Sequence, residues 1–307
     1  MNLNRIFVSI LTLFIVGIIG YCSRKKNILS EEAVNSLPKF LLNICSPLLI
    51  VSSMQIPFTQ DKLDDIKTVF LLSIIVYFIS IIISLIVPKL LRANGDNERG
   101  VYQFMTIFSN VSFIGFPVLL SIYSSEAIFY GSIFIIPFNI LLYTVGIYMM
   151  ASEKKKFNIK ILLNPNILAV IIGFLLFAFS IQIPAFLLQP MELVGNMTTP
   201  LSMIFIGGSL CGVNMKEMFK EWRLYAISAI RLLILPLIVL LLFQNFISDP
   251  LLLGVPVVIT GMPIAANCAI VAKEYGGHAE LASSGTFMST LLSMVTIPLL
   301  VLIISNI

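Results

Sequence analysis

Long apolar segments, separated by short polar connections, follow one another along almost the whole chain. Each is close to the roughly 20 residues that a helix needs to cross the ~30 Å hydrocarbon core of a bilayer. Strands of a membrane barrel would be about half as long and would alternate in polarity. The pattern therefore predicts an all-α membrane protein with ten transmembrane helices, expected at residues 6–22, 35–54, 68–91, 101–123, 127–151, 161–180, 189–211, 222–246, 252–272 and 281–306.

The composition agrees with the lipid bilayer as the main partner of this chain. Hydrophobic residues make up 58% of it and charged residues 11%, which leaves too little polar surface to cover a soluble globule. The net charge of +4 is spread over the connections and forms no single basic patch, so we expect no nucleic-acid partner. The four cysteines lack the spacing of a metal site and are read as small buried apolar residues.

The basic residues predict how the chain lies in the membrane. Of the 19 Lys and Arg residues, 14 fall in the connections between spans 1 and 2, 3 and 4, 5 and 6, 7 and 8, and 9 and 10. Only Arg5, Lys62 and Lys67 fall on the opposite side, while Lys39 and Arg231 lie inside apolar segments. Because basic connections stay on the cytoplasmic side, we expect a multi-pass protein of the cell membrane with both termini outside.

The two halves of the chain repeat at an offset of about 153 residues, at which residues 43–47 (NICSP) recur as 196–200 (NMTTP). The predicted halves are residues 1–152 and 161–307, joined by a basic link at 153–160. Since each half has an odd number of spans, its second copy is inverted in the membrane, as in many secondary carriers. The prediction is a five-plus-five inverted repeat, with chance similarity between apolar segments as the alternative.

Spans 4 and 9 occupy corresponding positions in the two halves, and both contain helix-breaking residues. Span 4 contains Asn110 and Pro117, and span 9 contains Pro263 and Asn267. Proline removes a backbone donor, so we predict that both spans break and cross near the middle of the membrane. The half-helices that start there would direct positive dipole ends at a small organic anion. The alternative is a pair of ordinary packing kinks.

Arg231 lies about 13 Å into span 8 at ~1.5 Å per residue, close to the middle of the hydrocarbon core. Such an arginine either contacts the substrate or is bonded to backbone carbonyls as a structural element. Lys39 lies near the end of span 2, where its ammonium group reaches the headgroups. Every carboxylate lies in a connection or near a span end, Glu192 being the deepest, which favours a uniporter or exchanger over a pump driven by carboxylate protonation.

Motifs of enzymes are missing from the sequence: it contains no phosphate-binding loop, nucleotide fingerprint, metal-ligand spacing or nucleophile elbow. We therefore expect no enzymatic activity, no cofactor and no bound metal.

Three groups of residues give the chain a family resemblance: Asn110 to Pro117 (NVSFIGFP), Asn164-Pro165-Asn166, and Pro263 followed by residues 272–275 (AKEY). In these it resembles the auxin efflux carrier family, along essentially all ten spans. The resemblance implies an elevator-like carrier, often a homodimer, with spans 1, 2, 6 and 7 as scaffold and spans 3–5 and 8–10 as transport domain. It also implies a substrate site at the crossing of spans 4 and 9.

Residues and resemblance together predict one substrate-binding set for a small carboxylate-class anion: Asn110, Pro117, Asn139, Asn166, Arg231, Pro263 and Asn267. Two alternatives remain. One is a symporter coupled to Na⁺ or H⁺, in which backbone carbonyls and Asn side chains hold the ion. The other is a membrane sensor or scaffold that does not transport.

Overall fold

The computed structural model describes residues 3–150, 164–212 and 218–305. Within these ranges the regular structure is helical, apart from one isolated bridge between Ser109 and Ile264. The predicted basic link at 153–160 lies outside the described residues. In chain order the main helices are α1 (Leu3–Lys25), α2 (Glu31–Phe40), η1 (Leu41–Cys45), α3 (Ser46–Ser53), α4 (Gln60–Leu90), α5 (Gly95–Ile107), η2 (Val111–Gly115), α6 (Phe116–Ile122), α7 (Ser125–Ile133), α8 (Ile135–Leu141), η3 (Leu142–Gly146), α9 (Ile147–Met150), α10 (Pro165–Ala178), α11 (Ala185–Asn196), α12 (Thr198–Ser209), η5 (Leu210–Gly212), α14 (Trp222–Ala229), η6 (Ile230–Ile234), α15 (Leu235–Phe243), α16 (Pro250–Thr260), α17 (Cys268–Tyr275) and α18 (Ala279–Ser305).

The short polar connections also start helices, because they supply N-cap residues. The side chain of Ser30 accepts a hydrogen bond from Ala33 N (3.1 Å), and that of Asn164 accepts one from Asn166 N (2.9 Å). Asp249 Oδ1 accepts from both Leu251 N (2.7 Å) and Leu252 N (3.0 Å). These bonds satisfy donors that have no partner in the first turn of a helix.

Several helices have the length and composition of membrane spans, which confirms an all-helical, multi-pass membrane protein. Four continuous helices in the described part of the chain meet both criteria, and a fifth is added if two helical pieces bent by 41° count as one. Three further apolar helices are shorter. The count of ten spans stays a prediction. The four are Glu31–Ser53, Gln60–Leu90, Trp222–Phe243 and Ala279–Ile304.

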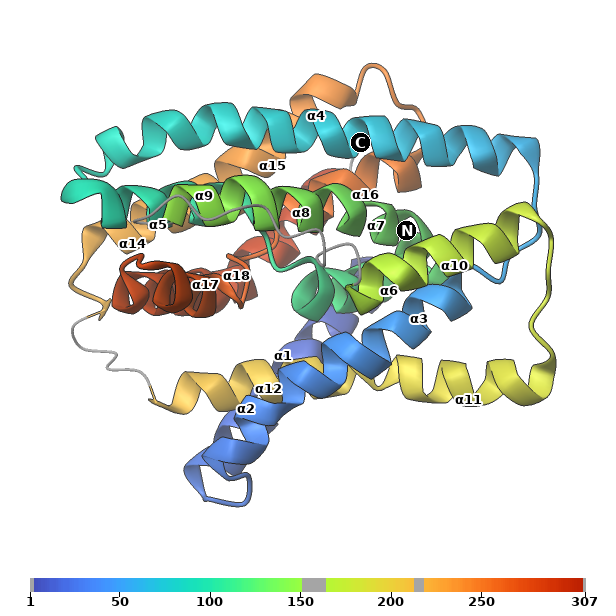
Figure 1. The fold of residues 1–307 in the computed structure, drawn as a ribbon, viewed down its shortest axis with the longest axis horizontal. Helices are drawn as coiled ribbons and strands as arrows, with labels where there is room; N and C mark the ends of the chain where they lie inside the picture. The colour runs from blue at the N-terminus through green and yellow to red at the C-terminus, as the bar shows by residue number, and fades with distance from the viewer. Residues whose placement is uncertain (1–2, 151–163, 213–217, 306–307) are drawn as a thin grey trace. The chain divides into compact units, whose positions relative to one another are not determined.

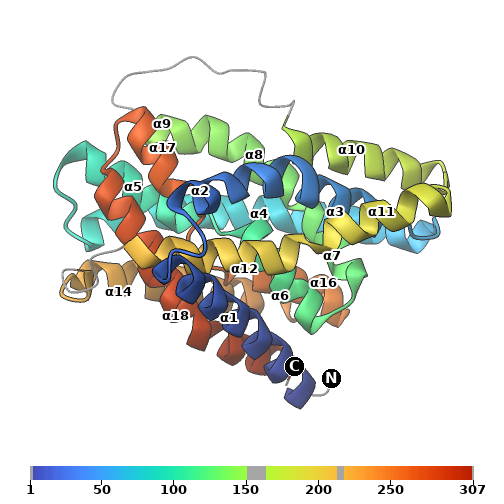
Figure 2. The ribbon, with the colours of Figure 1, turned by 90° about the horizontal axis from the view of Figure 1, so that it is seen from below.

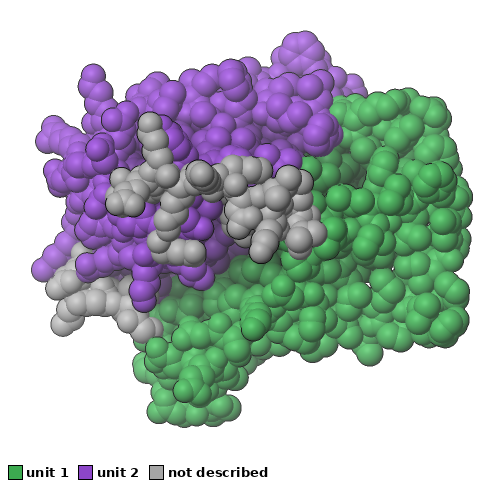
Figure 3. All heavy atoms as spheres, viewed as in Figure 1, with its two compact units in different colours: residues 1–69, 112–136, 162–212 green, residues 70–111, 137–161, 213–307 purple. Residues whose placement is uncertain are grey.

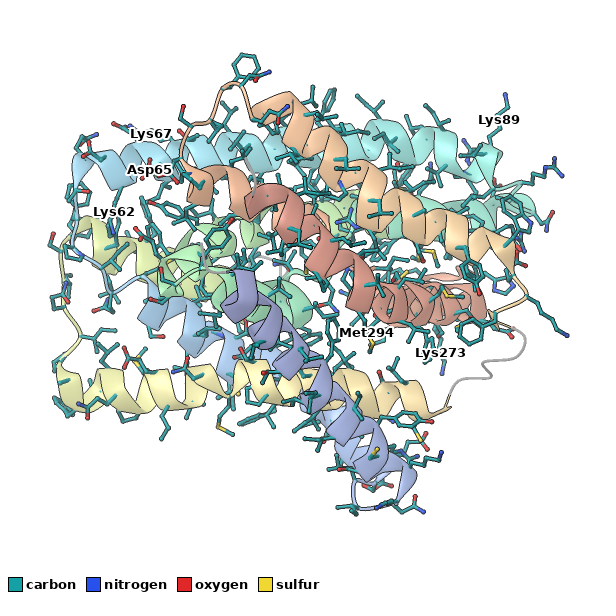
Figure 4. The ribbon with its side chains drawn as sticks, turned by 180° about the vertical axis from the view of Figure 1, so that it is seen from behind. Lys62, Asp65, Lys67, Lys89, Lys273 and Met294 are labelled. Carbon is teal, nitrogen blue, oxygen red and sulfur yellow. The ribbon has the colours of Figure 1, made fainter. Side chains whose placement is uncertain are left out.

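The charges on α4 lie at its two ends. Figure 4 places Lys62 and Lys67 near its first turns and Lys89 near its last turn. The 31 residues of α4 extend over about 46 Å at 1.5 Å per residue, which exceeds the ~30 Å hydrocarbon core. Both charged ends can therefore lie outside the core of the membrane.

The chain divides into two compact units, coloured separately in Figure 3. Unit 1 comprises residues 1–69, 112–136 and 162–212. Unit 2 comprises residues 70–111, 137–161 and 213–307. The boundary between the units falls directly after residue 111, so the two parts of predicted span 4 belong to different units.

Unit 1 contains two close helix packings. Helix α1 packs along α12 (Figure 1), and glycines permit the backbones to approach: a Cβ atom on Gly207 would meet the carbonyl group of Gly17. Helix α3 packs against both α10 and α11 (Figure 2). Beside α3, the ring of Phe177 lies 5.2 Å from that of Phe58 and 5.3 Å from that of Phe129. In a membrane no hydrophobic force drives helices together, because lipid tails are as apolar as the helices. Close contacts at glycines and between aromatic rings therefore hold these helices against each other.

Unit 2 carries an ion-pair cluster that joins the starts of α5 and α14. Arg223 Nη1 lies 3.0 Å from Glu98 Oε2, and Arg223 also forms a bidentate pair with Glu221, at 2.9 and 3.1 Å. The hydrogen bond from Arg223 lowers the pKa of Glu221 below its ordinary value of 4.5. Bidentate pairs of this kind are stronger than isolated surface pairs.

Replacing Arg223 with glutamine is expected to lower the melting temperature of the detergent-solubilised protein at pH 7. Because Glu221 has a lowered pKa in the folded state, its contribution is present above about pH 4.5 and is lost as the pH falls through the folded pKa. The difference between wild type and variant should therefore shrink at acid pH. The exposed Lys67–Asp64 pair provides the control, and Lys67→Gln is expected to change the melting temperature little. If both substitutions lowered the melting temperature equally, the ion-pair cluster of Arg223 would not be stronger than an exposed pair.

Candidate functional site

Two helices of unit 2 end at corresponding points of the chain. Helix α5 ends at Ile107 and α16 ends at Thr260, positions that differ by 153 residues. Phe108 then adopts an extended conformation, with φ −101° and ψ 113°. Helical structure resumes at Val111 in the first segment and at Cys268 in the second. Residues 108–110 and 261–267 are called the paired breaks below.

The paired breaks are joined to each other by backbone hydrogen bonds. Asn110 N donates to Pro263 O (2.8 Å), and Ala265 N donates to Phe108 O (3.0 Å). Between these bonds Ser109 and Ile264 form an antiparallel bridge. Ile264 N donates to Ser289 Oγ of α18 (3.1 Å). Backbone groups that leave helical structure inside an apolar protein need such partners, and here each break supplies one donor and one acceptor to the other.

The position of the break in span 4 differs from what its proline indicates. Pro117 lies in the first turn of α6, seven residues after Asn110, and the chain around it is helical. Pro256 likewise lies inside α16 without interrupting it, whereas Pro263 is part of a break. The helix of span 4 is therefore interrupted at residues 108–110, where its backbone is bonded to span 9, and not at Pro117.

Arg231 brings a buried positive charge to the ends of both helices. Its side chain is 2% exposed and lies in the π-helical turn η6. Nη1 donates to Thr106 O (2.9 Å) in the last turn of α5, and Nε donates to Met262 O (3.3 Å) just after α16. These bonds to backbone carbonyls fit the structural role that the sequence left open, and contact of Arg231 with a substrate stays a prediction. A single-turn π-helix is frequent at functional sites.

Three predicted site residues with amide side chains belong to unit 2. Asn110 and Asn139 are buried, the latter on α8. Asn267 precedes α17 and makes no capping bond to it, and its buried Oδ1 has no hydrogen-bond partner among the described residues. An amide side chain can present either a donor or an acceptor to a ligand by rotation.

The two remaining candidates, Pro117 and Asn166, belong to unit 1. Asn166 is buried in the first turn of α10, beside the capping residue Asn164. The structure thus groups Asn110, Pro263, Arg231 and Asn267 on or beside the paired breaks, by contacts within one unit. Sequence reasoning missed Thr106, Met262 and Ser289, because backbone carbonyls and helix serines give no distinctive signal.

The charge of the site is positive. Among the charged side chains whose burial the structure describes, only that of Arg231 is buried. No group of three or more potential metal ligands was found among the described residues. A buried guanidinium bonded only to neutral carbonyls keeps its full charge, and that charge acts strongly in a medium of low dielectric constant.

A family profile described as "Membrane transport protein" matches residues 5–159 and 153–301, nearly the whole chain. The chain belongs to this family. The match confirms the resemblance to auxin efflux carriers that the motifs of spans 4, 6 and 9 indicate.

Three relatives can be aligned with this chain over nearly its whole length. An uncharacterized transporter of Methanothermobacter thermautotrophicus is 26% identical over 95% of this chain and 96% of its own. An uncharacterized transporter of Methanocaldococcus jannaschii is 26% identical over 94% of this chain and 96% of its own. The lysosomal cholesterol signaling protein of Mus musculus is 20% identical over 95% of this chain, which covers 37% of the mouse protein. The names of the two archaeal relatives agree with a transporter.

Proposed function

We propose that the protein is a secondary transporter that moves a small organic anion of the carboxylate class across the cell membrane. The observation that carries the proposal is the site at the paired breaks: two interrupted helices meet there, and the only buried charge among the side chains whose burial the structure describes is positive. The transporter works as a uniporter or an exchanger, without enzymatic activity or a cofactor.

The electrostatics of the site favour an anion. Arg231 offsets the partial negative charge at the C-terminal ends of α5 and α16, so these helix ends do not repel an anion that approaches the paired breaks. The helix that starts at Cys268 adds the positive end of its dipole, and rotation of the Asn267 amide by 180° would present its nitrogen as a donor where the unpartnered oxygen now lies. In our proposal Asn110 and Asn139 complete the polar lining, and Pro117 and Asn166 contribute through the family resemblance.

Helix ends support the proposed ten-span inverted repeat. Several pairs of helices end at residues that differ by 153, the offset read from the sequence, including α5 and α16. An inverted pair of five-span halves would cross at the paired breaks and permit elevator-like alternating access. The pairs are Lys25 and Ala178, Leu90 and Phe243, Ile107 and Thr260, and Ile122 and Tyr275.

The orientation and assembly follow from the same proposal. Both termini lie outside the cell, because the basic connections favour the cytoplasm. The carrier is a homodimer, as the resemblance implies.

Counterflow in proteoliposomes tests the proposed function. Small carboxylates that raise the melting temperature of the purified protein would be loaded inside, and uptake of the labelled compound would be measured. For a uniporter of a monovalent anion, a potential of 100 mV supplies about 2.3 kcal/mol, so accumulation should change about 50-fold when the potential is applied. An exchanger of like charges would show counterflow without this response.

Asn110→Ala is expected to reduce counterflow at least tenfold, and protein-free vesicles give the background. Counterflow of neutral solutes in preference to anions would contradict the proposal. A ligand that stabilises the protein but never crosses the membrane would favour the sensor alternative.

A further inference from the structure

We propose that Arg231 occupies the place of a coupling cation at the paired breaks, so that the transporter works without bound Na⁺. The inference rests on the proposed transport function and specifies its energy source. It replaces the Na⁺-coupled alternative that the sequence leaves open.

Broken helices in membrane carriers create a place for a cation. Unwound backbone carbonyls and the C-terminal ends of half-helices carry partial negative charge, and in coupled carriers they coordinate Na⁺. In this protein α5 and α16 both end at the paired breaks, so their C-terminal ends face the same region of unit 2. The fold therefore creates the negative potential that a cation would neutralise.

Four backbone carbonyls at or beside the paired breaks already accept hydrogen bonds. Thr106 O and Met262 O accept from Arg231. Phe108 O accepts from Ala265 N, and the carbonyl of Pro263 accepts from Asn110 N. A sodium ion would have to share these carbonyls with their present donors, and two of the four carbonyls already bind a guanidinium group.

The charges also balance without an added ion. Each helix C-terminus is equivalent to about half a negative charge, so two of them are neutralised by one guanidinium group. Arginine stays protonated in proteins, and no carboxylate is buried among the side chains whose burial the structure describes. A sodium ion would add a second positive charge next to the first.

Arg231 is therefore a positioning residue for the paired breaks. It is held by the π-helical turn η6, and its 2% exposure shows that the charge does not reach bulk solvent. It fixes the ends of α5 and α16 relative to each other, as a bound metal ion does in a cation-coupled carrier.

Sodium titration of the full-length protein in detergent tests the inference, with Na⁺ itself as the probe. Melting temperature would be measured in NaCl and in choline chloride at equal ionic strength, for wild type, R231A, R231Q and R231K. Wild type and R231K should show no Na⁺-specific shift, because both carry the charge. R231A and R231Q should melt lower in choline and recover several degrees in Na⁺. R223Q, which removes an arginine away from the breaks, should melt lower in both salts equally.

A Na⁺-specific stabilisation of wild type would overturn the inference, and so would folded R231A and R231Q proteins that do not respond to Na⁺. If neither neutral variant folds, the wild-type titration and the initial rates of counterflow in Na⁺ and in choline still decide it. The sodium readout does not involve the transported anion. Absence of anion counterflow would reject the proposed function, whereas Na⁺-dependent counterflow would reject only the role of Arg231.

Discussion

Replacing Gly207 with alanine is expected to disrupt the packing of α1 on α12 and to lower the melting temperature of the protein strongly. The new Cβ atom would meet the carbonyl group of Gly17, and its distance to Gly17 C would be 2.6 Å. Because the obstacle is backbone, no side-chain rotation relieves it, and the helices must move apart. Overpacking of this kind costs about 1–3 kcal/mol or more. Gly20→Ala should act similarly, since its Cβ would lie 2.7 Å from Ile204 Cα.

Gly17 provides a matched control on the same face of α1. A Cβ atom there has Met203 O as its nearest neighbour, at an ordinary contact distance of 3.7 Å. Thermal unfolding in detergent and the folded fraction in size-exclusion chromatography would compare the three alanine variants. Equal behaviour of Gly17→Ala and Gly207→Ala would show that the close approach of the two helices does not stabilise the protein.

The positions of the helices could be predicted from the sequence because each helix coincides with a continuous run of apolar residues. Glu31–Ser53, Gln60–Leu90, Trp222–Phe243 and Ala279–Ile304 all fall on predicted spans. The break in span 4 could not be placed, because it depends on a partner 153 residues away. Asn110 N needs Pro263 O to leave the helix, and no local pattern records that bond.

Arg231 shows the same limit at the level of the site. Its depth in the membrane follows from counting residues in span 8, and the cost of burial requires some partner. Every residue has a backbone carbonyl, so the sequence does not indicate which carbonyls Arg231 binds. That choice depends on where α5 and α16 end in the fold. In the structure these partners are Thr106 O and Met262 O, at the ends of α5 and α16.

The two arguments about charge fit together physically. Arg231 neutralises the C-terminal ends of α5 and α16, whereas the helix that begins at Cys268 directs its positive end into the same breaks. The partial negative charge of the two helix C-termini is neutralised by Arg231, whereas the partial positive charge at the start of α17 has no such charged partner among the buried side chains that the structure describes. The remaining electrostatic potential at the breaks is therefore positive. In our proposal a small anion binds at the start of α17, where it does not compete with the bonds of Arg231.

Replacing Asn267 with aspartate is expected to abolish high-affinity anion transport while leaving the protein folded. Asn267 is the N-cap of α17, and its side chain makes no capping bond there. Aspartate is favourable at an N-cap and beside the positive end of a helix dipole, which offsets the cost of burying its carboxylate where the Asn267 oxygen is buried, so the protein should still fold. The fixed carboxylate would, however, occupy the positive potential that the transported anion needs. Uptake at low substrate concentration should fall about 10- to 100-fold, which corresponds to about 1.4–2.8 kcal/mol of lost binding.

Initial rates of counterflow over a range of substrate concentrations would separate this effect from a general loss of activity, because the apparent KM should rise before the maximal rate falls. Stabilisation of the protein by the same carboxylate in thermal unfolding should weaken in parallel. Asn94→Asp is the control, since it adds the same charge at the exposed N-cap of α5, where the side chain also makes no capping bond. Unchanged uptake by Asn267→Asp would mean that the anion does not approach the start of α17, and the substrate would then have to bind through Asn110 and Asn139 alone.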